Sequence, residues 1–290
     1  MADFTAGLVD VFAEAPLTGN PLAVVEGAEG LSDDVLRRIA REFNQAETTF
    51  LFRSERADWK LRSFTAAGVE VFGAGHNALG AWLWLGYGGQ LGSLRDAKTF
   101  HQEIGNDVLP ITLEERGGRI YGRMRQAPLR LQAPLQSFDD LAAALCLTDA
   151  DMLRSPTPRA ADTGASHLMV RVRDRAAVDR AAPNSELLLP VLKSASAEGC
   201  YIYAIDDAAP SHAYTRFFNP TVGLWEDSAT GTAAGPLAAY LGHEKLLTGG
   251  ELTIEQGAKM GRPSFLHVRL VPDPELSGSG VTVMRGTLRL

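Results

Sequence analysis

The sequence predicts an α+β protein with two pseudo-symmetric halves, each a mostly antiparallel sheet wrapped around a central apolar helix. The main observation is that three segments of the first half recur, in the same order, in the second half. Thr18–Val25 matches Thr163–Val170, Ala46–Phe52 matches Ala197–Tyr203, and Gly68–Gly80 matches Gly223–Gly235. Three ordered matches, each displaced by about half the chain, indicate an internal duplication. Duplicated α+β units commonly share a site in the cleft between the copies, so the halves are best compared with each other.

Composition and charge narrow the class of protein. The chain has 290 residues, of which 45% are hydrophobic and 22% charged, as expected for a globular protein with room for two domains. The formal net charge of −7 and the lack of a dense Lys/Arg block argue against nucleic-acid binding. The N-terminal segment has no basic signal-peptide region, and the apolar stretch Ala78–Tyr87 is too short to span a bilayer. We therefore expect a cytoplasmic protein with no nucleic-acid or membrane partner.

The cysteines and histidines form no recognisable metal or disulfide pattern. Cys146 falls in an apolar helical pattern and Cys200 in a strand-like run, so we expect two buried thiols. The six histidines include no His-Glu-x-x-His spacing. The pairs Ser166-His167 and Ser211-His212 are adjacent on expected strands, so their side chains point to opposite faces and cannot act as nucleophile–base couples. We expect neither a metal nor another cofactor.

The first half, residues 1–126, should contain a short amphipathic helix and one very apolar helix. Ser32 is the expected N-cap of a helix that ends near Phe43, and the apolar helix is expected at His76–Leu85. Alternating apolar patterns predict strands at Leu8–Phe12, Leu22–Val25, Thr48–Arg53, Trp59–Phe64, Leu109–Glu114 and Arg119–Arg125.

The second half, residues 127–290, follows a similar plan after an expected linker at Gln126–Pro134. Helices are expected at Phe138–Cys146, Glu186–Ala195 and Thr232–Leu241. Strands are expected at Leu168–Val172, Tyr201–Ile205 and Ala213–Phe218 and from Leu252 to the end of the chain. We expect the last strand to return onto the first half.

The two very apolar helices should be buried, because they are apolar on every side. Each follows a small-residue turn, Gly73–Gly75 in one half and Ser228–Gly231 in the other. The free N–H groups and positive dipole end of a buried helix start need a partner, which an anion can supply. We expect Gly75 and Gly231 to lie at these starts and to help bind a small carboxylate. The alternative is that the glycines only allow tight turns.

Three titratable residues lie near these helix starts. Glu47 begins an apolar strand, His76 begins the first buried helix, and Asp227 precedes the second. A desolvated carboxyl group favours its protonated form, which suits a general acid/base. The alternatives are an exposed strand-end carboxylate for Glu47, a hydrogen-bonded core histidine for His76, and an N-cap or turn residue for Asp227.

At these positions the chain resembles the PhzF-type phenazine-biosynthesis proteins. The signatures are Thr18-Gly-Asn-Pro-Leu-Ala-Val, Ala46-Glu-Thr-Thr-Phe, Gly75-His76, Glu226-Asp-Ser-Ala-Thr-Gly-Thr and Gly257-Ala-Lys-Met-Gly-Arg-Pro-Ser. They cover nearly the whole chain, in order.

The resemblance implies a diaminopimelate-epimerase-like fold, a homodimer, and a cofactor-independent isomerase that moves a proton between carbons of a cyclic amino/hydroxy carboxylate. Glu47 would be the catalytic acid/base, with His76 and Asp227 as supporting catalytic groups. The expected substrate-binding residues are Asn20, Gly75, Asn77, Gly231 and Thr232.

The chain departs from the family pattern at the two helix starts. Asn77 stands where the family usually has Pro or Ala, Ser228 replaces Pro, and Thr232 replaces Ser. Ala74 and Ala229 lie where the epimerase relatives place cysteines, which argues against a two-thiol racemase. We therefore expect a small cyclic acid other than the phenazine precursor as substrate. The alternative function is a non-catalytic carboxylate-binding protein that keeps the cleft.

Overall fold

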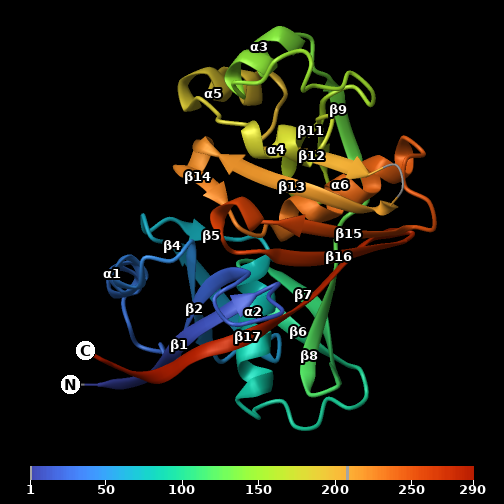
Figure 1. The fold of residues 1–290 in the computed structure, drawn as a ribbon. Coiled ribbons are helices and arrows are strands. Elements are labelled where there is room, and N and C mark those ends of the chain that lie inside the picture. Colours follow the sequence, from blue (N-terminus) through green and yellow to red (C-terminus); the bar gives the residue numbers. More distant parts are fainter. Residues whose placement is uncertain (1, 207–208) are drawn as a thin grey trace. The chain divides into compact units, whose positions relative to one another are not determined.

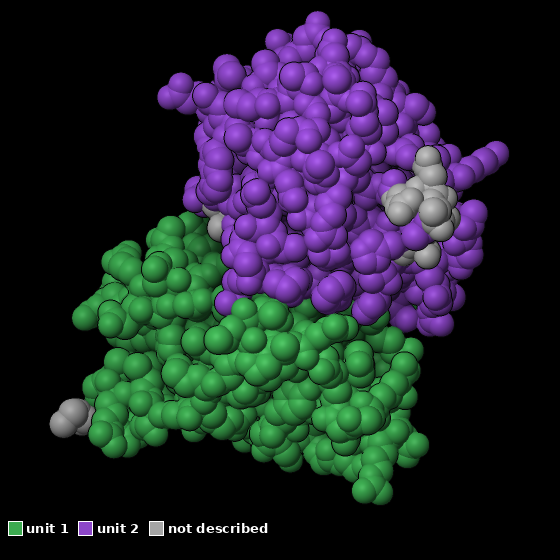
Figure 2. All heavy atoms as spheres, in the orientation of Figure 1, with its two compact units in different colours: residues 1–125, 277–290 green, residues 126–276 purple. Residues whose placement is uncertain are grey.

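The computed structural model describes residues 2–206 and 209–290. The chain divides into two compact units, coloured separately in Figure 2. Unit 1 comprises residues 1–125 and 277–290, and unit 2 comprises residues 126–276. The C-terminal residues therefore belong to the unit that contains the N-terminus.

Unit 1 contains two helices and most of the N-terminal strands. The helices are α1 (Asp33–Phe43) and α2 (His76–Tyr87). The strands are β1 (Asp3–Val11), β2 (Asn20–Glu26), β3 (Glu47–Phe52), β4 (Trp59–Thr65), β5 (Glu70–Val71), β6 (Lys98–Ile104), β7 (Asp107–Arg116), β8 (Arg119–Arg125) and the main part of β17 (Asp273–Arg289).

The described residues of unit 2 form four α-helices and two short 3-10 turns, besides eight strands. The helices are α3 (Phe138–Ala144), α4 (Arg175–Arg180), α5 (Ser185–Ser194) and α6 (Gly231–His243), with turns η1 (Pro220–Val222) and η2 (Ala258–Met260). The strands are β9 (Arg130–Pro134), β10 (Arg159–Asp162), β11 (Ser166–Arg171), β12 (Gly199–Asp206), β13 (Ala209–Asn219), β14 (Leu224–Asp227), β15 (Glu251–Gln256) and β16 (Ser264–Val271).

The two units repeat one pairing scheme. In unit 1, β1–β2, β3–β4, β4–β5 and β6–β7 are antiparallel, whereas β2–β3 and β4–β6 are parallel. In unit 2, β10–β11, β12–β13, β13–β14 and β15–β16 are antiparallel, whereas β11–β12 and β13–β15 are parallel. Each parallel pair requires a crossover connection, which α1 and α2 supply in unit 1. The repeated scheme is the structural counterpart of the repeated sequence segments.

The two central helices lie inside their own units, as their apolar sequences predict. Helix α2 packs against β1, β2, β3, β4 and β8, and Figure 1 shows it among the strands of unit 1. Trp82 and Trp84 of α2 are fully buried. Helix α6 packs against β10, β11, β15 and β16, and ten of its residues are buried. Such burial is the expected result for a helix with no polar face.

Each sheet has an outer face covered by other helices. In unit 1, Val25, Phe50 and Phe64 form a core cluster with residues of α1. In unit 2, Leu168 and Ile202 form a cluster with residues of α3, α4 and α5. Since strand residues alternate between faces, the neighbours of these residues point toward the central helix of their own unit.

Two details differ from the expectation. The stretch Gln126–Pro134 is not a plain linker, because Arg130–Pro134 forms β9, which is antiparallel to β10. Cys146 is exposed, because α3 ends before it and Cys146 follows with a φ of 53°. Cys200 is buried, as expected, and burial raises the pKa of its thiol. The last part of the C-terminal strand β17 pairs antiparallel with β1, from Asp3↔Arg289 to Val11↔Gly280.

Candidate active site

The starts of α2 and α6 differ from those of the other α-helices in the described part of the chain. Side chains of Ser32, Ser137, Asp174 and Asn184 accept a hydrogen bond from the first turn of α1, α3, α4 and α5. No side chain caps α2 or α6 in this way. The first N–H groups of a helix have no partner within the helix and carry its positive dipole end. These two helix starts are therefore suited to bind an anion.

The sheet of unit 1 places two of the predicted residues on the face that packs against α2. Leu22 faces α2, because a Cβ atom added to Gly80 would lie 2.6 Å from its Cδ2. Asn20 lies two residues before Leu22 on β2, and Glu47 is the parallel partner of Leu22 on β3. Both side chains thus lie on the face that packs against α2. Asn20 is buried, and His76 is the first residue of the helix.

The titratable side chains of Glu47 and His76 lie close together in unit 1. Oε2 of Glu47 lies 3.9 Å from Nδ1 of His76, and their side chains are 18% and 9% exposed. Burial lowers the pKa of His76 to about 4, so its imidazole is neutral at neutral pH. Nε2 of His76 is buried and has no hydrogen-bond partner among the described residues. Because a neutral imidazole does not form an ion pair with a carboxylate, the carboxylate beside it can accept a proton without first breaking such a pair.

Asn77 is tied into unit 1 by its own hydrogen bonds. Its Oδ1 accepts from the Gly75 backbone N–H at 2.8 Å, and its Nδ2 donates to the Gly73 carbonyl at 2.9 Å and to Ser63 Oγ at 3.1 Å. Ser63 Oγ also bonds Thr49 Oγ1 at 2.8 Å. This network links the turn before α2 to the sheet. The Asn77 side chain thus makes three hydrogen bonds within unit 1, and its expected contact with the substrate stays a prediction.

In unit 2, Asp227 lies at the end of β14, three residues before the N-cap of α6. Its Oδ2 accepts a hydrogen bond from Thr230 Oγ1 at 2.5 Å. Gln256, which is fully buried, donates to the Asp227 carbonyl at 2.8 Å and to Thr230 Oγ1 at 3.0 Å. Gln256 also accepts from Tyr201 at 2.8 Å. This network joins the turn before α6 to β12 and β15, as the Asn77 network does before α2.

Thr232, the second residue of α6, contacts a histidine that the sequence did not indicate. Its Oγ1 lies 3.2 Å from Nε2 of His167 on β11. His167 is buried, and its ring meets Phe217 edge-on with centroids 4.9 Å apart. Burial lowers the pKa of His167 to about 4, against a smaller opposite effect of the Asp162 carboxylate. His167 is therefore neutral at neutral pH.

Gly231, the first residue of α6, is held by Gln126. The Gln126 side chain donates to the Gly231 carbonyl at 2.9 Å and accepts from Thr163 Oγ1 at 2.7 Å. A Cβ atom at Gly235 would lie 1.7 Å from Oε1 of Gln126. The glycine at 235 therefore makes room for the amide that fixes the start of the helix.

The predicted residues thus form two sets. In unit 1, Asn20 and Glu47 lie on β2 and β3, and Gly75, His76 and Asn77 lie at the start of α2. Asp227, Gly231 and Thr232 surround the start of α6 in unit 2.

Among the described residues, no group of His, Cys, Asp and Glu side chains could hold a metal ion, and no helix is long and apolar enough to cross a membrane.

Sequence reasoning missed His167, Gln256 and Gln126. Gln126 lay in the expected linker, and Gln256 directly precedes the motif that begins at Gly257. His167 was considered only with its neighbour Ser166, whereas its contact lies 65 residues further along the chain. The only signal for His167 was its place inside the repeated segment Thr163–Val170.

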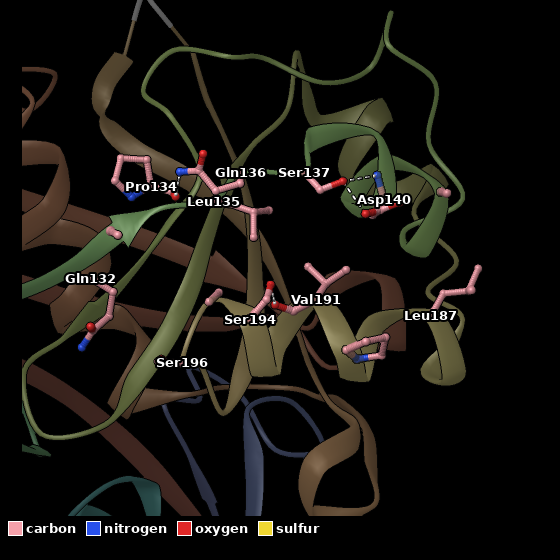
Figure 3. Close-up of a pocket in the computed structure, with 14 residues that line it drawn as sticks. Gln132, Pro134, Leu135, Gln136, Ser137, Asp140, Leu187, Val191, Ser194 and Ser196 are labelled. Carbon is pink, nitrogen blue, oxygen red and sulfur yellow. Dashed lines mark hydrogen bonds between the residues drawn. The ribbon is translucent and has the colours of Figure 1, made fainter.

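A cavity of about 540 Å³ in unit 2 lies apart from these residues. It is bordered by β9 and by the helices α3 and α5, as Figure 3 shows. Its lining includes Leu135, Val191 and Ser194, and none of the predicted site residues.

Comparisons with known proteins agree with this architecture. The sequence model of the phenazine biosynthesis-like protein family, PhzC-PhzF, matches residues 9–286. A trans-2,3-dihydro-3-hydroxyanthranilate isomerase of Pseudomonas aeruginosa is 32% identical over 293 residues, which is 96% of this chain and 97% of the relative. An uncharacterised isomerase of Clostridium acetobutylicum is 29% identical and covers 97% of each chain.

Solved structures show the same fold. A PhzF-family protein of Bacillus anthracis matches with a TM-score of 0.88 and 27% identity over 100% of both chains. A hydroxyproline epimerase of Agrobacterium vitis matches with a TM-score of 0.67 and 13% identity, covering 99% of this chain and 91% of that one. At that identity the likeness concerns the fold alone.

The fold and the relatives define an isomerase with a two-unit, epimerase-like α+β architecture. The chain belongs to the phenazine biosynthesis-like family of proteins.

Proposed function

We propose that this isomerase moves a proton between two carbon atoms of a small cyclic amino/hydroxy carboxylate, with Glu47 as the general acid/base and no cofactor. The observation that carries the proposal is the position of the Glu47 carboxylate, 3.9 Å from the neutral His76 imidazole at the uncapped start of α2. The carboxylate accepts the proton from one carbon. The proton on the resulting carboxyl group exchanges with solvent, and the carboxyl group then delivers a proton to another carbon as the ring double bond shifts.

His76 serves this step as a neutral hydrogen-bonding group. Its Nδ1 faces Glu47, and its buried Nε2 has no partner among the described residues. A buried polar atom is stabilised when a ligand supplies the missing hydrogen bond. We assign Nε2 to a polar substituent of the substrate ring, and Nδ1 to the orientation of the Glu47 carboxylate.

Each of the two uncapped helix starts is proposed as a receptor for a carboxylate. Backbone N–H groups following Gly75 and Gly231 and the hydroxyl of Thr232 are donors of the kind that a carboxylate requires. We propose that Asp227 binds a donor group of the ring and that Asn20 contributes a further polar contact. The active protein is expected to be a homodimer.

The substrate class follows from the relatives and from one side chain. Curated relatives are named for trans-2,3-dihydro-3-hydroxyanthranilate, a ring that carries amino, hydroxyl and carboxylate groups. Thr232 adds a methyl group at the start of α6. The Asn77 side chain makes hydrogen bonds within unit 1. The expected preference for a ring other than the phenazine precursor is therefore based mainly on Thr232, together with the buried Ser228.

The proposal can be tested by a search for substrates followed by a test for proton transfer. A panel of small cyclic carboxylates, with and without amino and hydroxyl groups, is screened for a rise in melting temperature. Ligands that stabilise the protein are then incubated with it in D2O. The account predicts an isomerised product with one deuterium at the carbon that gains the proton. Ligands that bind but never exchange or isomerise would instead indicate a binding protein.

A further inference from the structure

The contact between His167 and Thr232 leaves one nitrogen of the imidazole without a partner. Nε2 lies 3.2 Å from Thr232 Oγ1, whereas Nδ1 is buried and has no hydrogen-bond partner among the described residues. The ring makes an edge-on contact with Phe217, with an angle of 86° between the planes. A neutral imidazole carries one N–H, so the structure allows two arrangements of the hydrogen bond.

The two tautomers place very different groups in the protein interior. If Nδ1 carries the proton, a buried N–H has no acceptor, and Nε2 must accept from the Thr232 hydroxyl. If Nε2 carries the proton, it donates to Thr232, and only the lone pair of Nδ1 is left unpaired. Orphaned buried N–H groups are rarer in native structures than acceptors with unused lone pairs. The environment of His167 therefore favours the proton on Nε2.

The tautomer of His167 determines whether the Thr232 hydroxyl can donate a hydrogen bond to a ligand. When Thr232 Oγ1 accepts from His167, its own O–H is free to donate, because the hydroxyl has no other partner among the described residues. Thr232 is half-buried at the second position of α6, beside the uncapped N–H groups of that helix. A freely donating hydroxyl adds to those groups as a receptor for a carboxylate. The opposite tautomer would turn the oxygen lone pairs of Thr232 toward the anion and weaken the site.

We propose that His167 is a positioning residue, whose Nε2–H donates to Thr232 Oγ1 and so directs the Thr232 hydroxyl hydrogen toward the substrate carboxylate. The first part of this inference is a property of the free protein. The second part rests on the proposed function, because it assigns the carboxylate to the start of α6.

The tautomer is measured directly by NMR. Protein with 15N-labelled histidines is studied at pH 7, and the spectrum of His167→Gln identifies the His167 signals among the six histidines. The expected spectrum shows a bonded proton on Nε2 and an unprotonated Nδ1. A proton on Nδ1, or equal populations of the two tautomers, would overturn the inference whatever the substrate proves to be.

The consequence for binding is measured with anthranilate, a ring carboxylate with an amino group that cannot isomerise. His167→Phe keeps an aromatic ring against Phe217 but removes the donor, and it should weaken binding about 3- to 10-fold. His167→Gln, whose amide nitrogen can take the place of Nε2, should restore most of the affinity. In a Thr232→Val background, His167→Phe should have no further effect, because its action passes through the threonine hydroxyl.

Two results would count against the role in binding. An equal loss from His167→Phe in the wild-type and Thr232→Val backgrounds would show that His167 acts only through general packing. Failure of the wild-type protein to bind anthranilate or benzoate would overturn the assignment of the carboxylate together with the proposed function. The NMR experiment would still decide the tautomer.

Discussion

Glu47 and His76 come from different elements of unit 1, the first residue of β3 and the first residue of α2, and their side chains approach to 3.9 Å. The parallel pairing of β2 with β3 puts Glu47 on the sheet face that packs against α2. The burial that makes α2 a central helix also keeps His76 neutral. The geometry of the proposed acid/base pair is thus a direct result of the fold.

The buried histidines should make stability depend on pH. Burial lowers the pKa values of His76 and His167 to about 4 from the ordinary 6.5. Between these values the unfolded chain binds more protons than the folded protein, so stability is full above pH 6.5 and falls as the pH decreases toward 4. Each histidine should account for a loss of about 2 kcal/mol at pH 5. Urea unfolding at pH 7.5 and pH 5 measures the effect. Between these two pH values, the free energy of unfolding of His167→Phe should fall by less than that of the wild type.

The control for this experiment is His101→Gln, since the side chain of His101 is 55% exposed. That variant should keep the wild-type difference between the two pH values. If His167→Phe also keeps it, the ring at position 167 is not the source of the pH dependence.

Asn77 is predicted to hold the turn before α2. Asn77→Ala leaves the Gly75 N–H and the Gly73 carbonyl without their side-chain partners. The free energy of unfolding should fall by about 1–3 kcal/mol, and turnover should fall because His76 follows this turn. Thermal unfolding and steady-state kinetics measure the two effects. An unchanged melting temperature with only a raised KM would support direct substrate contact instead.

A glycine at position 235 is predicted to be required for stability only when residue 126 is glutamine. A Cβ atom at position 235 would displace Oε1 of Gln126 and break its bonds to Gly231 and Thr163. Gly235→Ala should therefore destabilise the protein by about 1–3 kcal/mol. In a Gln126→Ala background the same change should be neutral or stabilising, because alanine favours a helix over glycine by about 1 kcal/mol. Equal losses in both backgrounds, measured by urea unfolding, would contradict this explanation.

Thr232 is predicted to limit the range of substrates. Trans-2,3-dihydro-3-hydroxyanthranilate should be a poor substrate, with turnover below about 1 per second. Thr232→Ser keeps the hydroxyl and removes one methyl group, which should raise kcat/KM for this compound roughly 10-fold or more. Steady-state assays of both proteins test the prediction. Efficient turnover by the wild type would show that the methyl group is accommodated.

The sequence best predicted the features that depend on residues close together in the chain. The apolar runs predicted helices at His76–Leu85 and Thr232–Leu241, and the structure has α2 at His76–Tyr87 and α6 at Gly231–His243. The caps and apolar spacing of α1 were equally clear, because capping residues lie next to the turn that they satisfy.

The sequence could not predict contacts that depend on the partners of a strand. The parallel pairs β2–β3 and β11–β12 follow from the crossover connections of the whole unit, and no local pattern specifies them. The same is true of the bond between His167 and Thr232, which joins a strand to a helix. Asn77 shows the same limit, since the sequence indicated a polar residue at the helix start but not the hydrogen bonds that its amide makes to Gly75, Gly73 and Ser63.

The most direct test of the account is solvent deuterium incorporation by Glu47→Gln. Glutamine keeps the shape of the side chain and removes the group that carries the proton. With the substrate found in the screen, transfer of deuterium to carbon in D2O should slow by about 10²- to 10⁴-fold, while the affinity for the substrate changes little. If Glu47→Gln incorporates deuterium at the wild-type rate, another group carries the proton and the central claim is wrong.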